Sequence, residues 1–305
     1  MPSDSLRVRL GVDRPLILDG PTGSELERRG FRSHQTLWTA QAAELSPSLL
    51  ADIHRCYLHA GADLVTANTF RTTAWAARQA GVSMAQARGW LEQSVALARE
   101  ACAELAEQRW VLGSLAPLAD CYRPGDTPPD AILKTEHART ADWLAAAGCD
   151  AILVETQGCG REARIAVAAA RPSGLPVLVS FVPDLSGRRL LGGDELLGCA
   201  QHCLELGAAA VLVNCAHVEV LRPALAELQP LRRQGCTIGA YPNAARMLIE
   251  AGEPRWTADE PVLAAAALAQ AGLDFWQAGA RLLGACCGFG PDALALLAKT
   301  IKERA

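Results

Sequence analysis

Three features are missing from the 305-residue sequence, and each absence excludes a class of function. No charge-free apolar stretch of roughly 18 residues occurs, so we expect no transmembrane helix and no membrane partner. No basic run or basic stripe with aromatic residues occurs, and the net charge is −4, so we expect no nucleic-acid partner. The first residues, Met1 to Arg7, contain no apolar signal-peptide core, so we predict a cytoplasmic protein.

Disulfide bonds are not expected either, although cysteine is plentiful. The chain has eleven cysteines, and an odd number argues against a closed disulfide framework. Without a secretion signal, the thiols are predicted to be reduced. Four cysteines fall in helical patterns and are predicted to be small buried hydrophobic residues: Cys56, Cys102, Cys199 and Cys203.

Short apolar runs rich in Val, Ile and Leu recur along the chain, and each is followed by a polar segment and a helical pattern. Such runs are typical of parallel strands that are covered on both faces. The predicted strands are 16–19, 62–70, 110–116, 151–156, 176–182, 210–215, 237–242 and 281–286. The predicted helices are 47–60, 85–108, 130–147, 162–170, 195–206, 218–228, 261–271 and 292–303, several of which end at a glycine.

Eight strand–helix units in one series predict an α/β fold, a (β/α)8 TIM barrel. No linker or low-complexity stretch interrupts the series, so we assign residues 1–305 to a single domain. The segments 23–45 and 118–130 are long for barrel loops and follow the first and third predicted strands. We therefore expect both segments on the active-site face of the barrel.

Three cysteines carry the chemical argument. Cys215 ends the sixth predicted strand, and Cys286 and Cys287 end the eighth, so all three should meet on the face of the barrel where catalysis occurs. Three thiolates leave one position open on a tetrahedral zinc ion, which is the arrangement of a catalytic site. Consecutive strand residues point to opposite faces, so the adjacent pair shares one ion only if the strand breaks there. Gly284 and Gly288 permit such a break.

A zinc ion held in this way suits a reaction at a substrate thiol. With three thiolates the ion carries a net charge of −1, so it activates water poorly but still binds soft sulfur. A free thiol has a pKa of about 8.5 and is mostly protonated at neutral pH. Coordination removes that proton and holds the sulfur as a nucleophile. We therefore predict one Zn²⁺ per chain and alkylation of a substrate thiol.

Two carboxylates should lie at the same barrel mouth. Asp19 ends the first predicted strand and Glu155 ends the fourth, and together they suit the ammonium group of a substrate. The stretch from Asp19 to Ser24 offers backbone N–H groups and hydroxyls for a substrate carboxylate, with Gly20 and Thr22 as the predicted contacts. An amino-acid thiol would satisfy all of these features.

Seven stretches spread over nearly the whole chain carry a resemblance to a known family: Leu16–Leu26, Leu37–Ala40, Gly61–Phe70, Val154–Thr156, Val213–Cys215, Tyr241–Asn243 and Gly284–Gly288. They are similar, in order and content, to the motifs of the homocysteine S-methyltransferase family. The resemblance implies a zinc-dependent barrel that methylates homocysteine to methionine. It implies zinc on Cys215, Cys286 and Cys287, with the homocysteine sulfur as fourth ligand. It also implies that Asp19 and Glu155 hold the amino group of homocysteine.

Other residues of these stretches are predicted to contact the substrates, namely Trp38, Asn214 and Asn243. Trp38, Phe70 or Tyr241 would supply an aromatic face for a cationic methyl donor. We expect a monomer or a weak homo-oligomer.

Departures from the family's pattern narrow the choice of methyl donor. Ala285 replaces the second glycine of the usual Gly-Gly-Cys-Cys run. Thr156 and Arg71 stand where the betaine-using branch has tyrosines, which argues against betaine. We also expect no folate or cobalamin module. The stand-alone branch that the chain resembles uses sulfonium donors, S-methylmethionine or S-adenosylmethionine.

Several alternatives remain open at this stage. The same zinc chemistry would serve another donor, betaine included, or another thiol or selenol acceptor. The chain would otherwise be a barrel that binds zinc or thiols without catalysis. An aldolase or phosphate-binding barrel is disfavoured because none of the three lysines lies at a predicted strand end. The six histidines lack the spacing of paired metal ligands, and His217, just beyond Cys215, is the one expected near the site.

Overall fold

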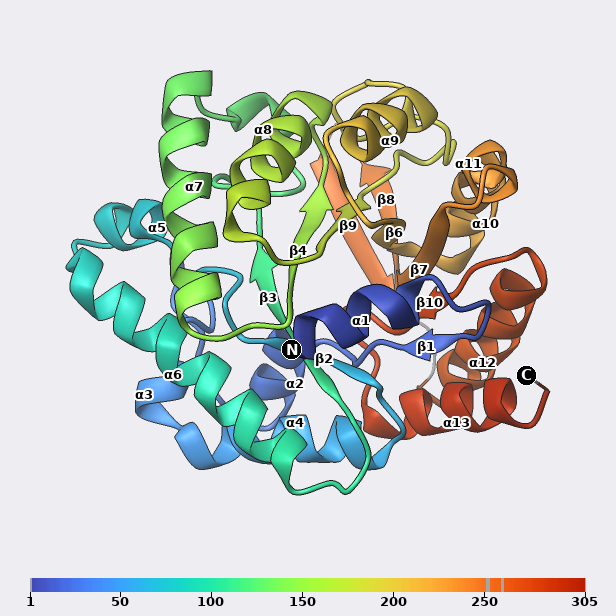
Figure 1. Ribbon diagram of the computed structural model, residues 1–305, viewed down its shortest axis with the longest axis horizontal. Coiled ribbons are helices and arrows are strands. Elements are labelled where there is room, and N and C mark those ends of the chain that lie inside the picture. The colour runs from blue at the N-terminus through green and yellow to red at the C-terminus, as the bar shows by residue number, and fades with distance from the viewer. Residues whose placement is uncertain (1, 251–252, 259–260, 305) are drawn as a thin grey trace.

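Eight parallel strands form a nearly closed barrel in the computed structural model, which describes residues 2–250, 253–258 and 261–304 (Figure 1). The strands are β1 (Leu16–Ile17), β2 (Leu64–Ala67), β3 (Trp110–Leu115), β4 (Ala151–Gln157), β5 (Val177–Phe181), β6 (Ala210–His217), β7 (Thr237–Asn243) and β10 (Leu282–Leu283). Their order around the sheet is β1-β10-β7-β6-β5-β4-β3-β2. Backbone hydrogen bonds beside β1 and β2 bring the two ends of this sheet together: Asp63 N–H donates to Ile17 O at 2.7 Å, and Asp19 N–H donates to Leu64 O at 2.9 Å. The predicted (β/α)8 barrel is confirmed.

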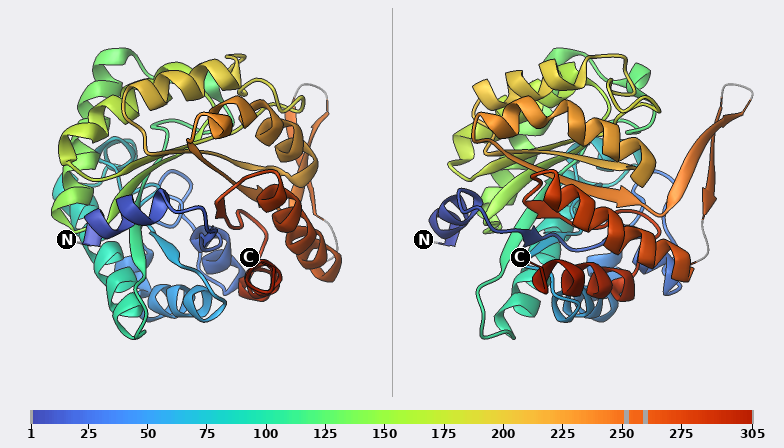
Figure 2. Two further views of the ribbon diagram at one scale, coloured as in Figure 1. Left: turned by 45° about the vertical axis from the view of Figure 1, so that its right-hand side comes forward. Right: turned by 90° about the vertical axis from the view of Figure 1, so that its right-hand side faces the viewer.

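All eight predicted helices are present outside the strands, where they form the outer layer (Figures 1 and 2). They are α4 (Pro47–His59), α6 (Met84–Ala103), α7 (Asp130–Ala146), α8 (Gly160–Ala170), α9 (Leu196–Glu205), α10 (Val218–Glu227), α12 (Pro261–Gln277) and α13 (Pro291–Lys302). Two ends were wrong: α6 ends at Ala103 and not at residue 108, and α12 continues past Gly272 instead of ending there. A Cβ at Gly272 would lie 2.0 Å from Leu297 Cδ1, so this glycine lets α12 approach α13 closely. No helix of the described residues is long and apolar enough to cross a membrane.

Several further elements have no counterpart in the sequence prediction. These are α1 (Pro2–Leu10), α2 (Thr22–Arg28), α3 (Ala42–Leu45), α5 (Ala74–Gln79), α11 (Gln229–Arg233), two short 3₁₀ turns, η1 (Pro124–Asp126) and η2 (Arg171–Ser173), and the antiparallel pair β8 (Ala245–Glu250) and β9 (Glu253–Ala258). The β8–β9 hairpin stands away from the barrel (Figure 2). α1 has a structural role: Leu6 and Leu10 are buried in the same cluster as the barrel-lining Leu16 and Leu112, so this helix covers one end of the barrel.

Two aspartates, each just before a strand, make the same pair of hydrogen bonds to the preceding strand. Asp63 donates its N–H to Ile17 O at 2.7 Å and accepts the N–H of Ile17 at 2.9 Å through its carboxylate. Asp150 makes the same pair of bonds with Val111, at 2.8 Å each. The Asp150 carboxylate also pairs with Arg99 at 2.9 Å. Each aspartate therefore ties the beginning of its own strand to an earlier strand of the barrel.

We expect Asp150→Ala to lower the free energy of unfolding by about 2–3 kcal/mol, since it leaves a buried N–H of Val111 without a partner and removes the ion pair of Arg99. Asp63→Ala should cost about half as much, because Asp63 is half-buried and its carboxylate accepts the one N–H of Ile17. Urea unfolding followed by circular dichroism measures both values. An equal loss in the two variants would contradict the role given to burial and the Arg99 pair.

Candidate active site

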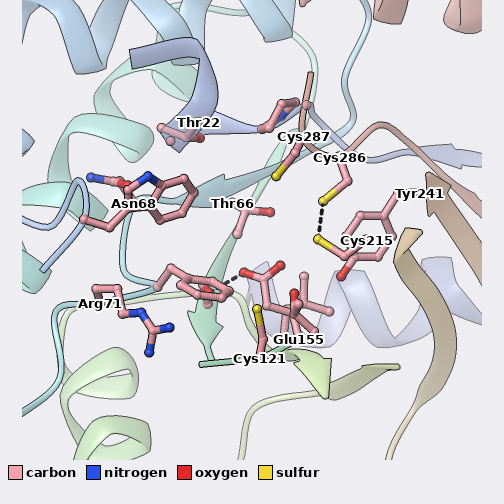
Figure 3. Close-up of a pocket in the computed structure, with 18 of the residues that line it drawn as sticks. Thr22, Thr66, Asn68, Arg71, Cys121, Glu155, Cys215, Tyr241, Cys286 and Cys287 are labelled. Carbon is pink, nitrogen blue, oxygen red and sulfur yellow. Dashed lines mark hydrogen bonds between the residues drawn. The ribbon is translucent and has the colours of Figure 1, made fainter. Parts of the chain in front are cut away.

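A cavity of about 440 Å³ opens at the carboxyl ends of the barrel strands (Figure 3). Its wall includes residues that follow or end β1, β4, β6 and β10, in particular Asp19, Glu155, Cys215, Cys286 and Cys287. These five residues were predicted to converge although up to 268 positions separate them in the chain. The barrel brings them into one space.

The three cysteine sulfurs lie together at one side of this cavity. All three Sγ atoms are within 4.8 Å of one another, and Cys215 Sγ is 3.0 Å from Cys286 Sγ. β10 ends at Leu283, before the predicted end at residue 286, so the strand stops ahead of the cysteine pair, which the sharing of one ion requires. Cys286 N–H then donates to Pro242 O at 2.8 Å, and Cys287 O accepts the N–H of Ala244 at 2.9 Å. These backbone bonds to the end of β7 turn both cysteines toward Cys215.

Ala285, which stands where the family has a glycine, fits into the segment just before the two cysteines. Its side chain is buried in the main apolar cluster, and the residue also lines the cavity. Its N–H donates to Asp19 O at 3.3 Å. Gly288, on the other side of the pair, has φ +88° and supplies the turn that a residue with a side chain would adopt only with strain.

Residues with strained backbone angles line this cavity. Among the described residues, three that are not glycine have positive φ, and all three line the cavity: Trp38 (+47°), Thr156 (+60°) and Cys215 (+54°). The strand register shifts between Val154 and Gln157 in β4, and again just after Asn214 in β6. Such irregularities re-aim side chains at the end of a strand, and strained backbone of this kind is concentrated at functional sites.

The sulfur cluster is chemically suited to a metal ion. Hydrogen bonds from Cys215 and Cys286 hold the pKa of Cys287 well below its usual range, whereas the pKa values of the other two thiols are raised. Protein groups alone therefore stabilise one thiolate in the trio. A bound cation is needed to ionise all three, and a set of three thiolates favours soft metal ions. Among the described residues this is the one such group of three or more possible ligands.

The two predicted carboxylates face the same cavity. Asp19 accepts hydrogen bonds from Thr66, from the N–H at 2.8 Å and from the hydroxyl at 3.1 Å. Glu155 accepts a hydrogen bond from the Ser114 hydroxyl. Burial raises the pKa of Asp19 to about 8 and that of Glu155 to about 7. Neither carboxylate has an ion-pair partner among the described residues, so a bound cationic group would restore their ionised form.

The remaining predicted contacts divide into two groups. Gly20, Thr22 and Trp38 line the cavity as expected. Asn214 and Asn243 do not line it. The Asn214 amide is fully buried and is used within the barrel, accepting from the Ser180 hydroxyl at 2.7 Å and donating to the Thr156 hydroxyl at 3.0 Å. Asn243 is also buried, at the end of β7.

His217, the histidine expected near the site, lies on the other side of Cys215. It caps α10, where its ring accepts the N–H of Glu219 at 3.4 Å. It lines a second, smaller cavity of about 210 Å³ that shares Cys215 with the main one. Cys215 thus contributes to the walls of both cavities, and His217 is not in the wall of the larger one.

Comparison with known proteins agrees with this geometry. The model of the homocysteine S-methyltransferase family matches residues 16–301. The chain belongs to this family. Homocysteine S-methyltransferase YbgG of Bacillus subtilis is 28% identical over 295 residues, which cover 91% of each chain. A selenocysteine methyltransferase of Astragalus bisulcatus is 27% identical over 318 residues, covering 92% of this chain and 90% of that protein.

A solved structure extends the likeness to three dimensions. The homocysteine methyltransferase MmuM from Escherichia coli, in its metallated form, has a TM-score of 0.80 and 28% sequence identity to this chain. The match covers 98% of this chain and 99% of that one. The protein is therefore a methyltransferase with the barrel of its family.

This methyltransferase also has cavity residues that the sequence analysis did not predict to contact a substrate. Arg71 follows β2, and Asp120, Cys121 and Tyr122 come from the loop after β3. The Tyr122 hydroxyl donates to Cys215 O at 3.5 Å. The length of the 118–130 segment predicted its position on the active-site face. No motif within the segment indicated which of its residues line the cavity.

We expect the methyltransferase, purified under reductant, to bind one thiophilic metal ion per chain. Cys287→Ser should weaken binding by more than the roughly 10–100-fold that loss of an outer-shell partner costs, because a metal-ligating sulfur is removed. Mass spectrometry of metal content, with a chelator competition, measures this. Cys236→Ser is the matched control, since Cys236 is half-buried and outside both cavities. Full metal content in Cys287→Ser under competition would exclude the trio as the site.

Proposed function

We propose that the protein transfers a methyl group from a sulfonium donor, S-methylmethionine or S-adenosylmethionine, to the thiol of homocysteine, giving methionine. The observation that carries the proposal is the cavity that has three converging sulfurs on one side and the two carboxylates Asp19 and Glu155 in the same wall. Family membership supports methyl transfer to homocysteine.

Zinc is the metal that we propose for the cysteine trio. Bound zinc would lower the pKa of a substrate thiol and keep its sulfur available as a nucleophile. Support comes from the chemistry of the donors, since three thiolates with an open fourth position suit this ion. Sulfurs that all lie within 4.8 Å of one another need only small adjustments to surround it at about 2.3 Å each.

Homocysteine has three polar groups, and the cavity has a counterpart for each. Its sulfur would lie at the cysteine trio, and its ammonium group would lie between Asp19 and Glu155. The raised pKa values of these two carboxyl groups favour this assignment, because a buried carboxylate without a cation is the group that gains most from an arriving ammonium. Its carboxylate would accept N–H groups near Gly20 and Thr22.

The transfer itself needs alignment more than acid–base catalysis. The thiol proton leaves before the transfer, so the attacking group is a thiolate. The new bond joins the homocysteine sulfur to the methyl carbon, and the donor's sulfur keeps the electron pair of the bond that breaks. Two neutral thioethers result. The protein's contribution is to hold the two sulfurs in line with the carbon, with the aromatic faces of Trp38, Phe70 and Tyr241 beside the sulfonium.

We expect zinc-loaded, reduced protein to form methionine from homocysteine and S-methylmethionine, and to lose this activity on chelation. S-adenosylmethionine and betaine in parallel reactions identify the donor. Selenocysteine is tested in competition with homocysteine to identify the acceptor, because one relative is named a selenocysteine methyltransferase. Methionine analysis by mass spectrometry measures the product. Undiminished activity in a zinc-free sample would exclude the proposed chemistry.

We expect Glu155→Gln to raise the KM for homocysteine by about 10- to 100-fold, because one charge-assisted contact to the ammonium group is removed. The KM of the donor should change much less. Steady-state kinetics with each substrate varied in turn measures the two effects. A rise confined to the donor would show that Glu155 serves the other substrate.

A further inference from the structure

We infer that Arg71 is the carboxylate-binding residue for the methyl donor, and that the enzyme therefore selects sulfonium donors that carry a carboxylate. The inference rests on the proposed methyl transfer and names the class of its second substrate. It starts from the charges in the cavity wall. Arg71 is the one Lys or Arg among the described residues that line the cavity, whereas Asp19, Asp120 and Glu155 are acidic.

The guanidinium of Arg71 is held in place by backbone carbonyls. Its Nη1 donates to Pro117 O at 3.2 Å and to Ala119 O at 3.0 Å, both in the segment after β3. Its carbon lies 5.2 Å from the centre of the Phe70 ring, which in turn packs edge-on against Trp38 with ring centroids 5.8 Å apart. A guanidinium fixed on one side in this way is already oriented for a ligand on its other side.

The other edge of this guanidinium is available. Within the described residues, Nε and Nη2 of Arg71 donate no hydrogen bond, and no carboxylate forms an ion pair with the side chain. These two nitrogens make the fork that binds a carboxylate through two parallel hydrogen bonds. A half-buried arginine that lines a cavity and lacks an anionic partner is a binding group for an anion.

The anion belongs to the donor because homocysteine is already accounted for. In the proposed reaction its sulfur, ammonium and carboxylate lie at the cysteine trio, at Asp19 and Glu155, and near Gly20. Figure 3 shows Arg71 on the opposite side of the drawn residues from Cys215 and Cys286. A donor whose carboxylate is held by Arg71 would extend its sulfonium past the Phe70 and Trp38 rings toward the acceptor.

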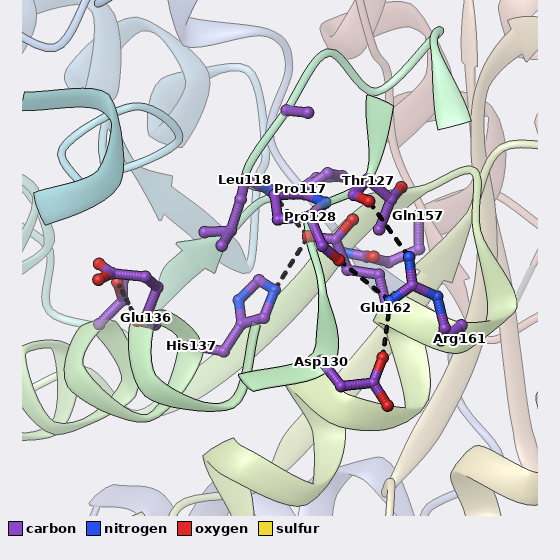
Figure 4. Close-up of polar contacts among 12 residues, drawn as sticks. Pro117, Leu118, Thr127, Pro128, Asp130, Glu136, His137, Gln157, Arg161 and Glu162 are labelled. Atoms are coloured by element: carbon purple, nitrogen blue, oxygen red, sulfur yellow. Dashed lines mark hydrogen bonds and ion pairs between the residues drawn. The ribbon is translucent and has the colours of Figure 1, made fainter. Parts of the chain in front are cut away.

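Arg71 is not the main support of the loop that it contacts. Arg161 donates to Thr127 O at 3.2 Å and Pro128 O at 3.0 Å and pairs with Asp130 at 2.6 Å (Figure 4). At the start of the loop, Glu162 accepts the N–H of Leu118 at 2.9 Å. Arg161 thus holds the same loop by the same kind of bond but lies outside the cavity, which makes Arg161→Gln the matched control.

The test compares S-methylmethionine with its carboxamide in the wild-type enzyme and in Arg71→Gln. In the wild type, kcat/KM should be 10- to 100-fold higher for the acid, the range of one charge-assisted contact. Arg71→Gln should remove most of that preference by raising the KM of the acid, while the KM of homocysteine changes less than about threefold. Arg161→Gln should keep the preference. Equal losses with acid and amide, or a rise in the KM of homocysteine instead, would overturn the inference.

Calorimetry separates this inference from the proposed reaction. S-methylmethionine and its carboxamide are titrated into each variant without an acceptor, so that binding is measured alone. A wild-type preference for the acid that Arg71→Gln abolishes would support the site even if no donor is turned over. Methionine formation combined with no such preference in binding or kinetics would keep the reaction and reject the role of Arg71.

Discussion

The two-sided pairing of β1 is the constraint on which the site depends. β1 has two residues, yet the backbone that follows it bonds to both neighbours: Leu18 N–H donates to Leu283 O at 2.7 Å, and Asp19 N–H donates to Leu64 O at 2.9 Å. These bonds fix Asp19 between Thr66 and the cysteine segment. A slip of one residue in this register would turn Asp19 away from the cavity and separate it from the cysteine pair.

The site gathers features that lower the stability of a folded chain, and other parts of the barrel compensate for them. Left-handed backbone at Thr156 and Cys215 costs on the order of 1–3 kcal/mol at each position. Crowded thiols and carboxylates without counterions add to this cost. The compensating elements lie at the opposite end, where α1 covers the barrel core and Asp150 joins two strands. The chain thus separates the end that stabilises the barrel from the end that reacts.

The sequence predicted the barrel well because its signals are periodic and local. Apolar runs, helix starts and glycine ends repeat along the chain, and strand ends then indicate which side chains meet, so the sequence alone could place Asp19, Glu155 and the cysteines in one cavity. Side-chain direction was less accessible. Asn214 stands next to Cys215, but the irregularity after it leaves Asn214 within the barrel wall and Cys215 in the cavity. Gly272 has the local pattern of a helix end, whereas its close contact with Leu297 of α13 leaves no signal in the neighbouring sequence. Arg71 differs from the residue of a related branch, but its function depends on carbonyls about 46 positions away, which no local pattern indicates.

The charges of the cavity also explain how the proposed reaction could proceed in one direction. In the proposed reaction the acceptor sulfur is anionic and the donor sulfur is cationic before transfer, and a metal held by the cysteine trio and the aromatic faces would bind those charged forms. Transfer of the methyl group removes both charges together, so a poorly hydrated cavity favours the products over the reactants. A neutral thioether is a weaker ligand than a thiolate and gains less from an aromatic ring than a sulfonium does. Under this proposal the groups that hold the reactants would hold the products less tightly, and methyl transfer itself would promote product release.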